Sequence, residues 1–402
     1  MNGSTNLGAT VDFRRVTKRF GLGRGGPAAV NDLSLTVPPG EICVLVGPSG
    51  CGKTTSLKMV NRLVEPTEGQ VLIDGQDVAQ VEVTALRRRI GYVIQQIGLF
   101  PHQTIADNVG TVPRLLGWPR ERIRRRVDEL LALIGLDPAR VRNRYPSQLS
   151  GGERQRVGVA RAMAAEPPVM LMDEPFGAVD PIVRERLQNE FLRLHRELRT
   201  TVLFVTHDID EAIKMGDRVA VMQQGGYLAQ YAPPSELLTN PANDFVARFV
   251  GADRGLKRLS LMTVGDVKLS DATTARQGEA VQAIRARAAA AAARHVLLLD
   301  ADNQPLGWLQ VERLPAEGVA DVGGADPSSP VFTGETTLRD ALSMLLGSAV
   351  QTGVVVSPSG RYEGVLTLDS VGTALRAATS RVTASTDGAS SGLATHEHSV
   401  QP

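Results

Sequence analysis

A glycine-rich stretch between an apolar run and a helix-like run has the spacing of a phosphate-binding loop. Residues 47–54, GPSGCGKT, fit the pattern G-x-x-x-x-G-K-[ST]. Glycines let backbone N–H groups wrap a phosphate, and the N-terminus of the following helix adds a partial positive charge. In this pattern Lys53 reaches the β- and γ-phosphates of a nucleotide and the Thr54 hydroxyl binds Mg²⁺. The predicted nucleotide-contacting residues are Gly47, Pro48, Ser49, Gly50, Cys51, Gly52, Lys53, Thr54 and Thr55.

Two adjacent carboxylates end another apolar run. Residues 169–172 predict a buried strand, and Asp173 and Glu174 follow where such a strand leaves the core. Asp173 suits Mg²⁺ binding through water, and Glu174 suits a general base that activates the attacking water. An apolar strand ending in Asp-Glu often has no chemical role, so this pattern gains its meaning from the phosphate loop.

Other chemically capable residues have ordinary explanations. Gly21 to Gly26 fits G-x-G-x-x-G, but a proline and a strand-like run follow it, which predicts a hairpin loop rather than a dinucleotide site. Cys43 is expected in the core. Cys51 is a spacer in the loop, although the nearby helix N-terminus could lower its pKa and make the thiol open to alkylation. His396 and His398 lie in a tail that is expected to be disordered.

The elements that position these groups have the pattern of an α/β domain from Val11 to about Ala252. Buried strands are expected at 41–46, 169–172 and 202–206, a helix at 54–63, and a hairpin formed by 219–222 and 227–231. Between about 100 and 165 the apolar residues recur at helical spacing, as at Ile123, Val127, Leu130, Leu131 and Ile134. This predicts a helical subdomain inserted into the α/β core.

An internal repeat begins after Gly255. Residues 295–314 align with 352–371 at an offset of 57, which places Gly307 on Gly364. A helix-like stretch precedes each copy, so two helix–strand–turn–strand units are expected to bury their apolar faces together. Residues 380–402 are rich in Ser, Thr, Ala and Gly and are expected to be disordered.

The composition excludes several classes of protein. There are 44 basic and 43 acidic residues, a balance that lacks the positive charge of a nucleic-acid-binding protein. No apolar run approaches the roughly 18 residues of a membrane span, and no secretion leader is recognised at the start. The 2 cysteines give no disulfide framework. The expectation is a soluble, reduced, cytosolic chain of two to three domains.

The stretch LSGGERQR, residues 149–156, resembles the signature motif of ATP-binding-cassette (ABC) ATPases. The other motifs of that family occur in the expected order. Gln95 matches the Q-loop, Asp180 in GAVD matches the D-loop with a mild departure, and His207 matches the switch histidine. Phe20 lies where the family stacks an aromatic ring on adenine. The resemblance covers roughly residues 11–252.

The resemblance implies an ATPase whose two cassettes face each other head to tail around two ATP molecules. Ser150, Gly151 and Gly152 would then contact the γ-phosphate held by the partner. The implied catalytic residues are Glu174, His207 and Gln95. The implied nucleotide contacts add Phe20, Ser150, Gly151, Gly152 and Asp180 to the phosphate loop, and the implied Mg²⁺ ligands are Thr54, Gln95 and Asp173.

The C-terminal repeat resembles a tandem of cystathionine-β-synthase-like (CBS) domains, at 258–316 and 325–378. A cassette followed by such a tandem is similar to the ATPase subunits of importers for glycine betaine, choline, carnitine or proline. This implies two membrane permease subunits, a substrate-binding protein, a second copy of the chain, no nucleic acid, and a peripheral place at the cytoplasmic face of the membrane. The permeases would contact residues 96–102.

Two points about the CBS tandem remain open. Where adenosine-binding members carry Thr or Ser and then Asp, the first copy has Gln310 and Arg313, and the second has Thr367 and Ser370. Residues 256–380 hold 11 basic and 13 acidic residues, a net of −2, although an ionic-strength sensor near an anionic membrane needs a basic surface.

The alternatives for the function of the whole chain are an importer of another small solute, a soluble ABC ATPase acting on ribosomes or DNA, and a non-catalytic cassette.

Overall fold

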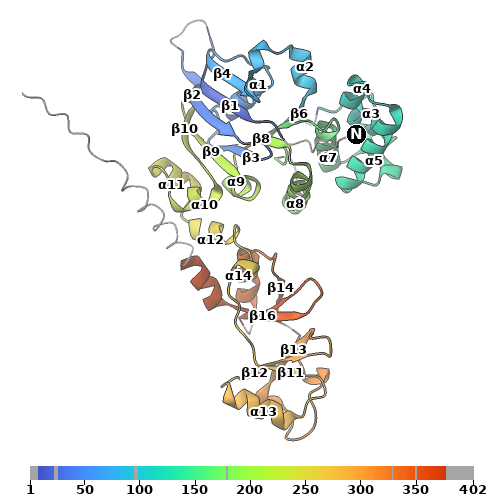
Figure 1. Ribbon diagram of the computed structural model, residues 1–402, viewed down its shortest axis with the longest axis vertical. Helices are drawn as coiled ribbons and strands as arrows, with labels where there is room; N and C mark the ends of the chain where they lie inside the picture. Colours follow the sequence, from blue (N-terminus) through green and yellow to red (C-terminus); the bar gives the residue numbers. More distant parts are fainter. Residues whose placement is uncertain are drawn as a thin grey trace, which may run out of the picture. The chain divides into compact units, whose positions relative to one another are not determined.

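A computed structural model describes residues 8–21, 26–94, 98–177, 180–327, 329–348 and 351–376 (Figure 1). Gln95, residues 96 and 97 of the expected permease contact, most of the Gly21–Gly26 loop and the expected tail at 380–402 lie outside these ranges. The chain divides into two compact units between Ala252 and Asp253. No helix in the described ranges is both long enough and apolar enough to cross a bilayer.

The first unit is built on a six-stranded sheet. Its order is β10-β9-β3-β8-β7-β6, and all neighbours are parallel except the antiparallel pair β9–β10. β3, β7 and β8 are buried along their whole length, as continuous apolar runs in parallel sheets are. The strands are β3 (Ile42–Val46), β6 (Ile90–Val93), β7 (Val169–Asp173), β8 (Thr201–Thr206), β9 (Arg218–Gln223) and β10 (Tyr227–Ala232). The expected strands and late hairpin are confirmed.

Successive residues of β3 face two different cores. Val44 packs in the cluster on one face of the sheet with helices such as α8, and Cys43 and Leu45 pack on the other face with α1. That second face is covered by α1 and by an antiparallel sheet of order β2-β1-β4-β5. Its strands are β1 (Val11–Arg19), β2 (Ala28–Val37), β4 (Glu68–Ile73) and β5 (Gln76–Asp77). β3, which leads into the phosphate loop, is therefore held by apolar contacts on both of its faces.

Helices account for most of the segment between β6 and β7, as expected for residues 100–165 (Figure 1). Val127, Leu130, Leu131 and Ile134 are buried, which confirms the apolar face of α5. The helix expected at 54–63 is shorter, because Asn61 ends α1 and the next residue has a positive φ. The helices of the unit are α1 (Lys53–Val60), α2 (Val83–Arg88), α3 (Ile105–Val109), α4 (Thr111–Leu115), α5 (Arg120–Leu133), α6 (Pro138–Val141), α7 (Gly151–Met163), α8 (Pro181–Leu198), α9 (Ile209–Met215), α10 (Pro234–Thr239) and α11 (Asp244–Val250).

The second unit repeats one arrangement twice. In each copy a short strand pairs in parallel with a second strand, which pairs antiparallel with a third, and a helix follows the first strand. Gly307 lies opposite Leu298 and Gly364 opposite Val355, so the repeat offset also holds in the strand register. The elements are α12 (Arg254–Leu259), β11 (Thr274–Arg276), α13 (Val281–Ala290), β12 (His295–Leu299), β13 (Pro305–Gln310), β14 (Val331–Thr333), α14 (Leu338–Gly347), β15 (Thr352–Val356) and β16 (Tyr362–Thr367).

The two copies share apolar contacts and exchange backbone hydrogen bonds. Trp308 of the first copy and Val354 of the second belong to one buried cluster, which confirms that apolar faces are buried together. The backbone of Ser270, which precedes β11, pairs with Val365 of the second copy, and Asp326, which precedes β14, pairs with Trp308 of the first. The leading strands β11 and β14 were not anticipated, because three residues are too few for a recognisable strand pattern.

Candidate functional site

The phosphate loop joins the end of β3 to the start of α1, where its glycines are required by their surroundings. A Cβ on Gly47 would collide with the carbonyl oxygen of Met222, and one on Gly52 with that of Ala29. Both glycines also have positive φ, 153° and 97°. Backbone from β9 and β2 thus fixes the path of the loop at both ends.

Lys53 lies inside the loop, 7% exposed. Its Nζ donates hydrogen bonds to the carbonyl oxygens of Gly47, at 2.6 Å, and Pro48, at 3.0 Å. These bonds hold the ammonium group within the turn of backbone that the sequence pattern assigns to phosphate. The arrangement provides a fixed positive charge next to the loop amides.

Thr54 and Asp173 meet across the end of the sheet. The Thr54 hydroxyl donates to Asp173 Oδ1 at 2.9 Å. Burial raises the pKa of the Asp173 carboxyl, and the nearby charge of Glu174 adds to that rise, whereas the Thr54 hydrogen bond opposes it. A hydroxyl and a carboxylate are hard oxygen donors, and Mg²⁺ is usually held by one or two carboxylates with substrate phosphates. The two residues fit the Mg²⁺ expected from the sequence.

A polar cavity of about 240 Å³ opens in front of the loop. It contains Lys53, Thr54 and, from the residue after β7, Glu174. The Lys53 ammonium, the Thr54 hydroxyl and the Glu174 carboxylate therefore surround one space. Its lining residues are Ala29, Ser49, Gly50, Cys51, Gly52, Lys53, Thr54, Thr55 and Glu174.

Glu174 is held in an uncommon backbone conformation. Its φ is 47°, and its N–H donates to the carbonyl oxygen of Val205 at 3.0 Å. The carboxylate Oε1 lies 3.2 Å from Nδ1 of His207, the residue after β8. Because β7 and β8 are neighbours in the sheet, their ends bring the two side chains together. An ionised carboxylate can only accept, so with Glu174 ionised Nδ1 of His207 is the donor in this contact and Nε2 is left for a ligand.

The signature residues lie apart from this cavity. Ser150 caps α7: its hydroxyl accepts from the Glu153 N–H at 3.3 Å, and the Glu153 carboxylate accepts from the Ser150 N–H at 2.7 Å. That N–H holds the pKa of Glu153 below its usual range. A Cβ on Gly151 or Gly152 would meet no atom of the described residues within 4 Å. The N-terminal end of α7 is thus an open surface, and the cavity lining within the described ranges includes none of these residues.

Two further sequence-predicted residues, Asp180 and Phe20, also lie outside the cavity lining given by the described residues. Asp180 is exposed and caps α8, accepting from the Ile182 N–H at 3.0 Å. Phe20 is 56% exposed, with Lys18 Nζ 5.1 Å from the centre of its ring. Gln95 belongs to the undescribed residues. These residues remain predictions as ligands.

The prediction of a reactive thiol is wrong in direction. Burial raises the pKa of Cys51, and this effect outweighs the nearby Lys53 charge. The side chain is completely buried, so the helix terminus does not act on an exposed thiol. Cys43 is buried as expected, and burial raises the pKa of its thiol to about 12.

Two glutamines support the site without any recognisable motif of their own. Gln224 Nε2 donates to the Ser49 carbonyl at 3.0 Å and ties the β9–β10 turn to the phosphate loop. Gln155 of α7 is buried and donates to the Pro175 carbonyl, directly after Glu174. The glycine pair at the β9–β10 turn predicts a hairpin, but no local signal places that turn beside the loop.

Comparison with known proteins gives concordant results. Residues 30–177 match the family model described as ABC transporter. The chain is 48% identical to an osmoprotectant import ATP-binding protein of Salmonella typhimurium, over 89% of this chain and 94% of that protein. It is 43% identical to a glycine betaine/carnitine/choline transport ATP-binding protein of Bacillus subtilis, over 86% of this chain and 91% of that one.

A solved dimeric bacterial ABC transporter cassette has a similar fold. The TM-score is 0.51 at 35% identity, and the match covers 56% of this chain and 98% of the cassette. A second structure of that cassette, in a post-hydrolysis state with ADP and phosphate, matches with a TM-score of 0.50 and the same 35% identity. The solved similarity thus covers the length of one cassette.

Proposed function

The chain belongs to the ATP-binding subunits of ABC-type osmoprotectant importers, and on this premise we propose how its site powers import of a quaternary amine. It is an ATPase subunit that drives import through membrane partners. The observation that carries the mechanism is the 240 Å³ cavity that brings Lys53, Thr54 and Glu174 together. The proposed solute is glycine betaine, choline, carnitine or proline, and another small solute is the alternative. The names of the relatives print the first three of these solutes.

The cavity residues take distinct roles toward ATP. Lys53 and the loop amides hold the β- and γ-phosphates. Thr54 and Asp173, with Gln95, are the proposed Mg²⁺ ligands, and bound Mg²⁺ neutralises charge that develops on the phosphates. Glu174 accepts a proton from the attacking water, whose oxygen bonds to the γ-phosphorus as the bond from that phosphorus to ADP breaks. His207 orients Glu174 through Nδ1 and offers Nε2 to the γ-phosphate.

The second half of each site comes from another copy of the chain. In one chain the signature residues Ser150, Gly151 and Gly152 are outside the cavity and face open space. A helix N-terminus with exposed amides favours an anion. In the proposed head-to-tail dimer this surface covers the partner's γ-phosphate, with Asp180 and Phe20 as further contacts. The dimeric state of the similar cassette supports this arrangement.

The remaining partners follow from the family. We infer two permease subunits and a substrate-binding protein, with the chain bound peripherally at the cytoplasmic face of the membrane. The second unit is proposed to be a regulatory CBS tandem, supported by its two copies of one strand order. Residues 256–380 hold 11 basic and 13 acidic residues, a net of −2. Lys257 is buried and its Nζ lies 3.1 Å from Asp253 Oδ1, so it does not provide an exposed charge for an anionic surface.

Uptake measurements test the function directly. Cells carrying the native chain and cells carrying Glu174→Gln are compared for uptake of labelled glycine betaine, choline, carnitine and proline after a salt upshift. Loss of one of these uptakes in the variant supports the proposal and names the solute. Glu68→Gln, which changes an exposed carboxylate on β4 in the same way, is the control. Four unchanged uptakes with normal expression contradict the osmoprotectant assignment.

A further inference from the structure

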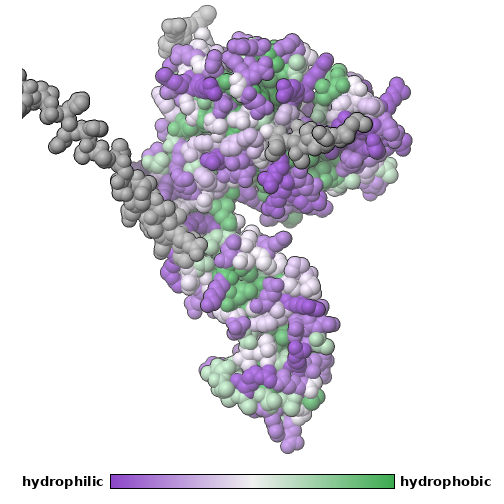
Figure 2. Space-filling model, viewed as in Figure 1, coloured by the Kyte–Doolittle hydropathy of each residue, from purple (hydrophilic) through white to green (hydrophobic). Residues whose placement is uncertain are grey.

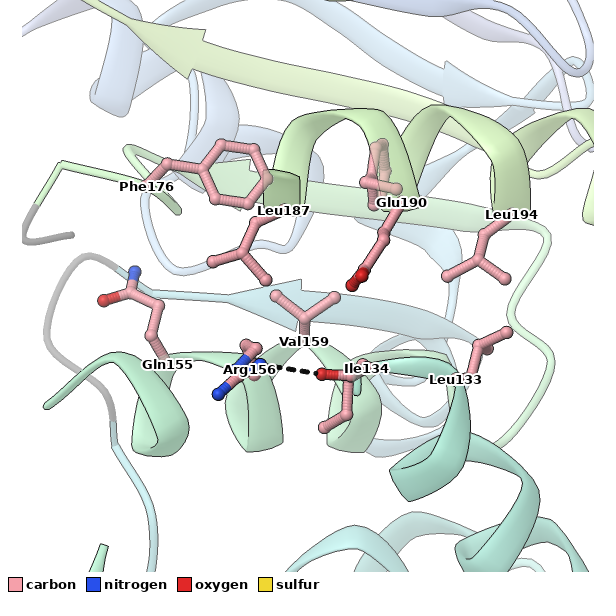
Figure 3. Close-up of a pocket in the computed structure, with 10 residues that line it drawn as sticks. Leu133, Ile134, Gln155, Arg156, Val159, Phe176, Leu187, Glu190 and Leu194 are labelled. Carbon is pink, nitrogen blue, oxygen red and sulfur yellow. Dashed lines mark hydrogen bonds between the residues drawn. The ribbon is translucent and has the colours of Figure 1, made fainter. Parts of the chain in front are cut away.

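A small cavity separates α7 from α8 in the first unit (Figure 3). Its volume is about 20 Å³, and apolar side chains such as Val159 of α7 and Leu187 and Leu194 of α8 form most of its wall. A cavity of this size holds about one water molecule. A small approach of the two helices would therefore close it.

Two charged side chains line this cavity, and each has one buried polar atom without a hydrogen bond from the described residues. Arg156 Nε of α7 and Glu190 Oε2 of α8 are buried and have no hydrogen-bond partner among the described residues. Arg156 bonds elsewhere, donating from Nη1 to the Ile134 carbonyl at 3.2 Å, and Glu190 accepts through Oε1 from Arg186 Nε at 3.1 Å. Buried polar atoms of charged groups cost free energy when unpaired. A direct ion pair between Arg156 and Glu190 would give both of these atoms a partner and so lower the free energy.

The two groups already converge on one point. A Cβ placed on Gly135 would lie 3.4 Å from Arg156 Nη1, 3.7 Å from Arg186 Nη2 and 3.9 Å from Glu190 Oε1. Figure 3 shows the Glu190 carboxylate pointing from α8 toward α7, between Leu187 and Leu194. Since Gly135 has no side chain, the guanidinium groups of Arg156 and Arg186 and the Glu190 carboxylate all border one open point, and Arg186 is the present partner of Glu190. A direct ion pair formed at this partly buried point would be stronger than one on the surface.

The helices that carry the pair lead directly to the functional motifs. Ser150 caps α7, and Asp180 caps α8. Next to Arg156, Gln155 donates to the Pro175 carbonyl, one residue beyond Glu174. Because a helix moves as a rigid body, a shift of α7 against α8 at this cavity also moves its capped end relative to Glu174.

We propose that Arg156 and Glu190 are a positioning pair, whose direct ion pair forms as α7 and α8 approach and sets the signature end of α7 for the partner's nucleotide. The proposal rests on the function given above. Neither side chain touches the nucleotide. Their effect passes through α7, and it belongs to the ATP-bound dimer rather than to the free chain.

A double-mutant cycle in two states tests the pair. The full chain with Glu174→Gln is the parent, to which Arg156→Gln, Glu190→Gln and both together are added. Analytical ultracentrifugation measures dimerisation with ATP and Mg²⁺, and urea unfolding measures stability without nucleotide. We expect each single change to weaken dimerisation by roughly tenfold and the double change to weaken it no further, because neighbouring residues are coupled. In the nucleotide-free chain we expect the two effects on unfolding to add.

Two further variants separate the pair from general damage. Arg186→Gln removes the present partner of Glu190, an exposed side chain, and should leave dimerisation within about twofold of the parent. Arg156→Glu combined with Glu190→Arg should recover dimerisation that either reversed charge alone destroys.

The outcomes distinguish the pair from the function on which it rests. Two outcomes overturn the positioning pair alone, in a parent that dimerises with ATP. In the first, the effects of the two single changes on dimerisation add. In the second, the effects of the two changes are coupled as strongly without nucleotide as with it. A parent that neither binds ATP nor dimerises overturns the proposed function and the pair with it. Coupling found only with ATP supports both.

Discussion

Among single residues, Glu174 has the most sharply defined environment. Its left-handed backbone and its N–H bond to Val205 direct the carboxylate toward His207, 3.2 Å away. Glu174→Gln keeps the size and the hydrogen-bonding shape but cannot accept a proton. We expect ATP hydrolysis to fall by roughly 10²- to 10⁴-fold, the usual contribution of a general base. Steady-state phosphate release measures this change.

The same variant should bind ATP as well as the native chain does. Fluorescent-nucleotide titration provides this check, and Glu68→Gln is the control for loss of an exposed carboxylate. Full turnover by the Gln variant would assign the base to another group.

Asp173 predicts a pH-dependent stability. Its pKa in the folded chain is raised by burial, so the folded chain keeps a proton that the unfolded chain loses above about pH 4. Unfolding free energy therefore falls as pH rises through the window between these two pKa values and stays lower above it. Asp173→Asn removes this loss. We expect it to raise the melting temperature of the nucleotide-free chain at pH 7 more than at pH 4.

Thermal unfolding from pH 4 to 8 measures the difference, with and without ATP and Mg²⁺. The same variant should gain less stability from Mg²⁺-ATP than the native chain does, because a proposed Mg²⁺ ligand is lost. Asp302→Asn, at an exposed position, is the matched control. A difference that shrinks toward pH 7 would contradict the buried-carboxyl account.

The Cys51 thiol should be slow to alkylate. Burial raises its pKa, so little thiolate is present at pH 7.5, and the buried sulfur has poor access to reagent. We expect N-ethylmaleimide to modify the folded chain at least about tenfold more slowly than free cysteine, and the urea-unfolded chain at the free rate. Mass spectrometry of timed samples distinguishes Cys51 from Cys43. Rapid modification of Cys51 in the folded chain would restore the helix-terminus interpretation.

At the scale of elements, the phosphate loop predicts a contrast between two glycines. Gly52 and Gly75 both have positive φ, 97° and 75°, but a Cβ on Gly52 would collide with Ala29 whereas one on Gly75 would meet nothing within 4 Å. Gly75→Ala carries only the left-handed strain of about 1–2 kcal/mol. Gly52→Ala adds the collision and should lose more stability together with ATP binding. Urea unfolding and nucleotide titration compare the two, and equal losses would contradict the role of Ala29.

The sequence predicts the elements of this site better than the contacts between them. The apolar runs at β3, β7 and β8 and the loop glycines are local signals, so their structures could be predicted. Contacts between β7 and β8 depend on strand order, which no local pattern states, and this order brings Glu174 to His207. The roles of Gln224 and Gln155 depend on the same distant packing. The Cys51 error arose because burial is also non-local.

For the whole molecule, the boundary between Ala252 and Asp253 predicts a separable activity. A chain ending at Ala252 keeps the six-stranded sheet, the phosphate loop and α7. We expect it to hydrolyse ATP at a rate similar to that of the full chain. Transport by cells carrying it should lose the salt dependence given by the full chain, if the second unit is regulatory. Uptake across a salt series measures this, and unchanged dependence contradicts that role.

The exchanged backbone bonds in the second unit bear on how such a molecule could arise. Ser270 pairs with the later copy and Asp326 with the earlier one, so each lead-in segment completes its neighbour's sheet. One copy made alone would leave the edge beside Gly307 or Gly364 without its partner. An ancestor of single-copy length would have needed to dimerise, with the segment before the first strand of each molecule pairing with the sheet of the other. Gene duplication and fusion would then have placed both copies, and the exchange of segments between them, in one chain.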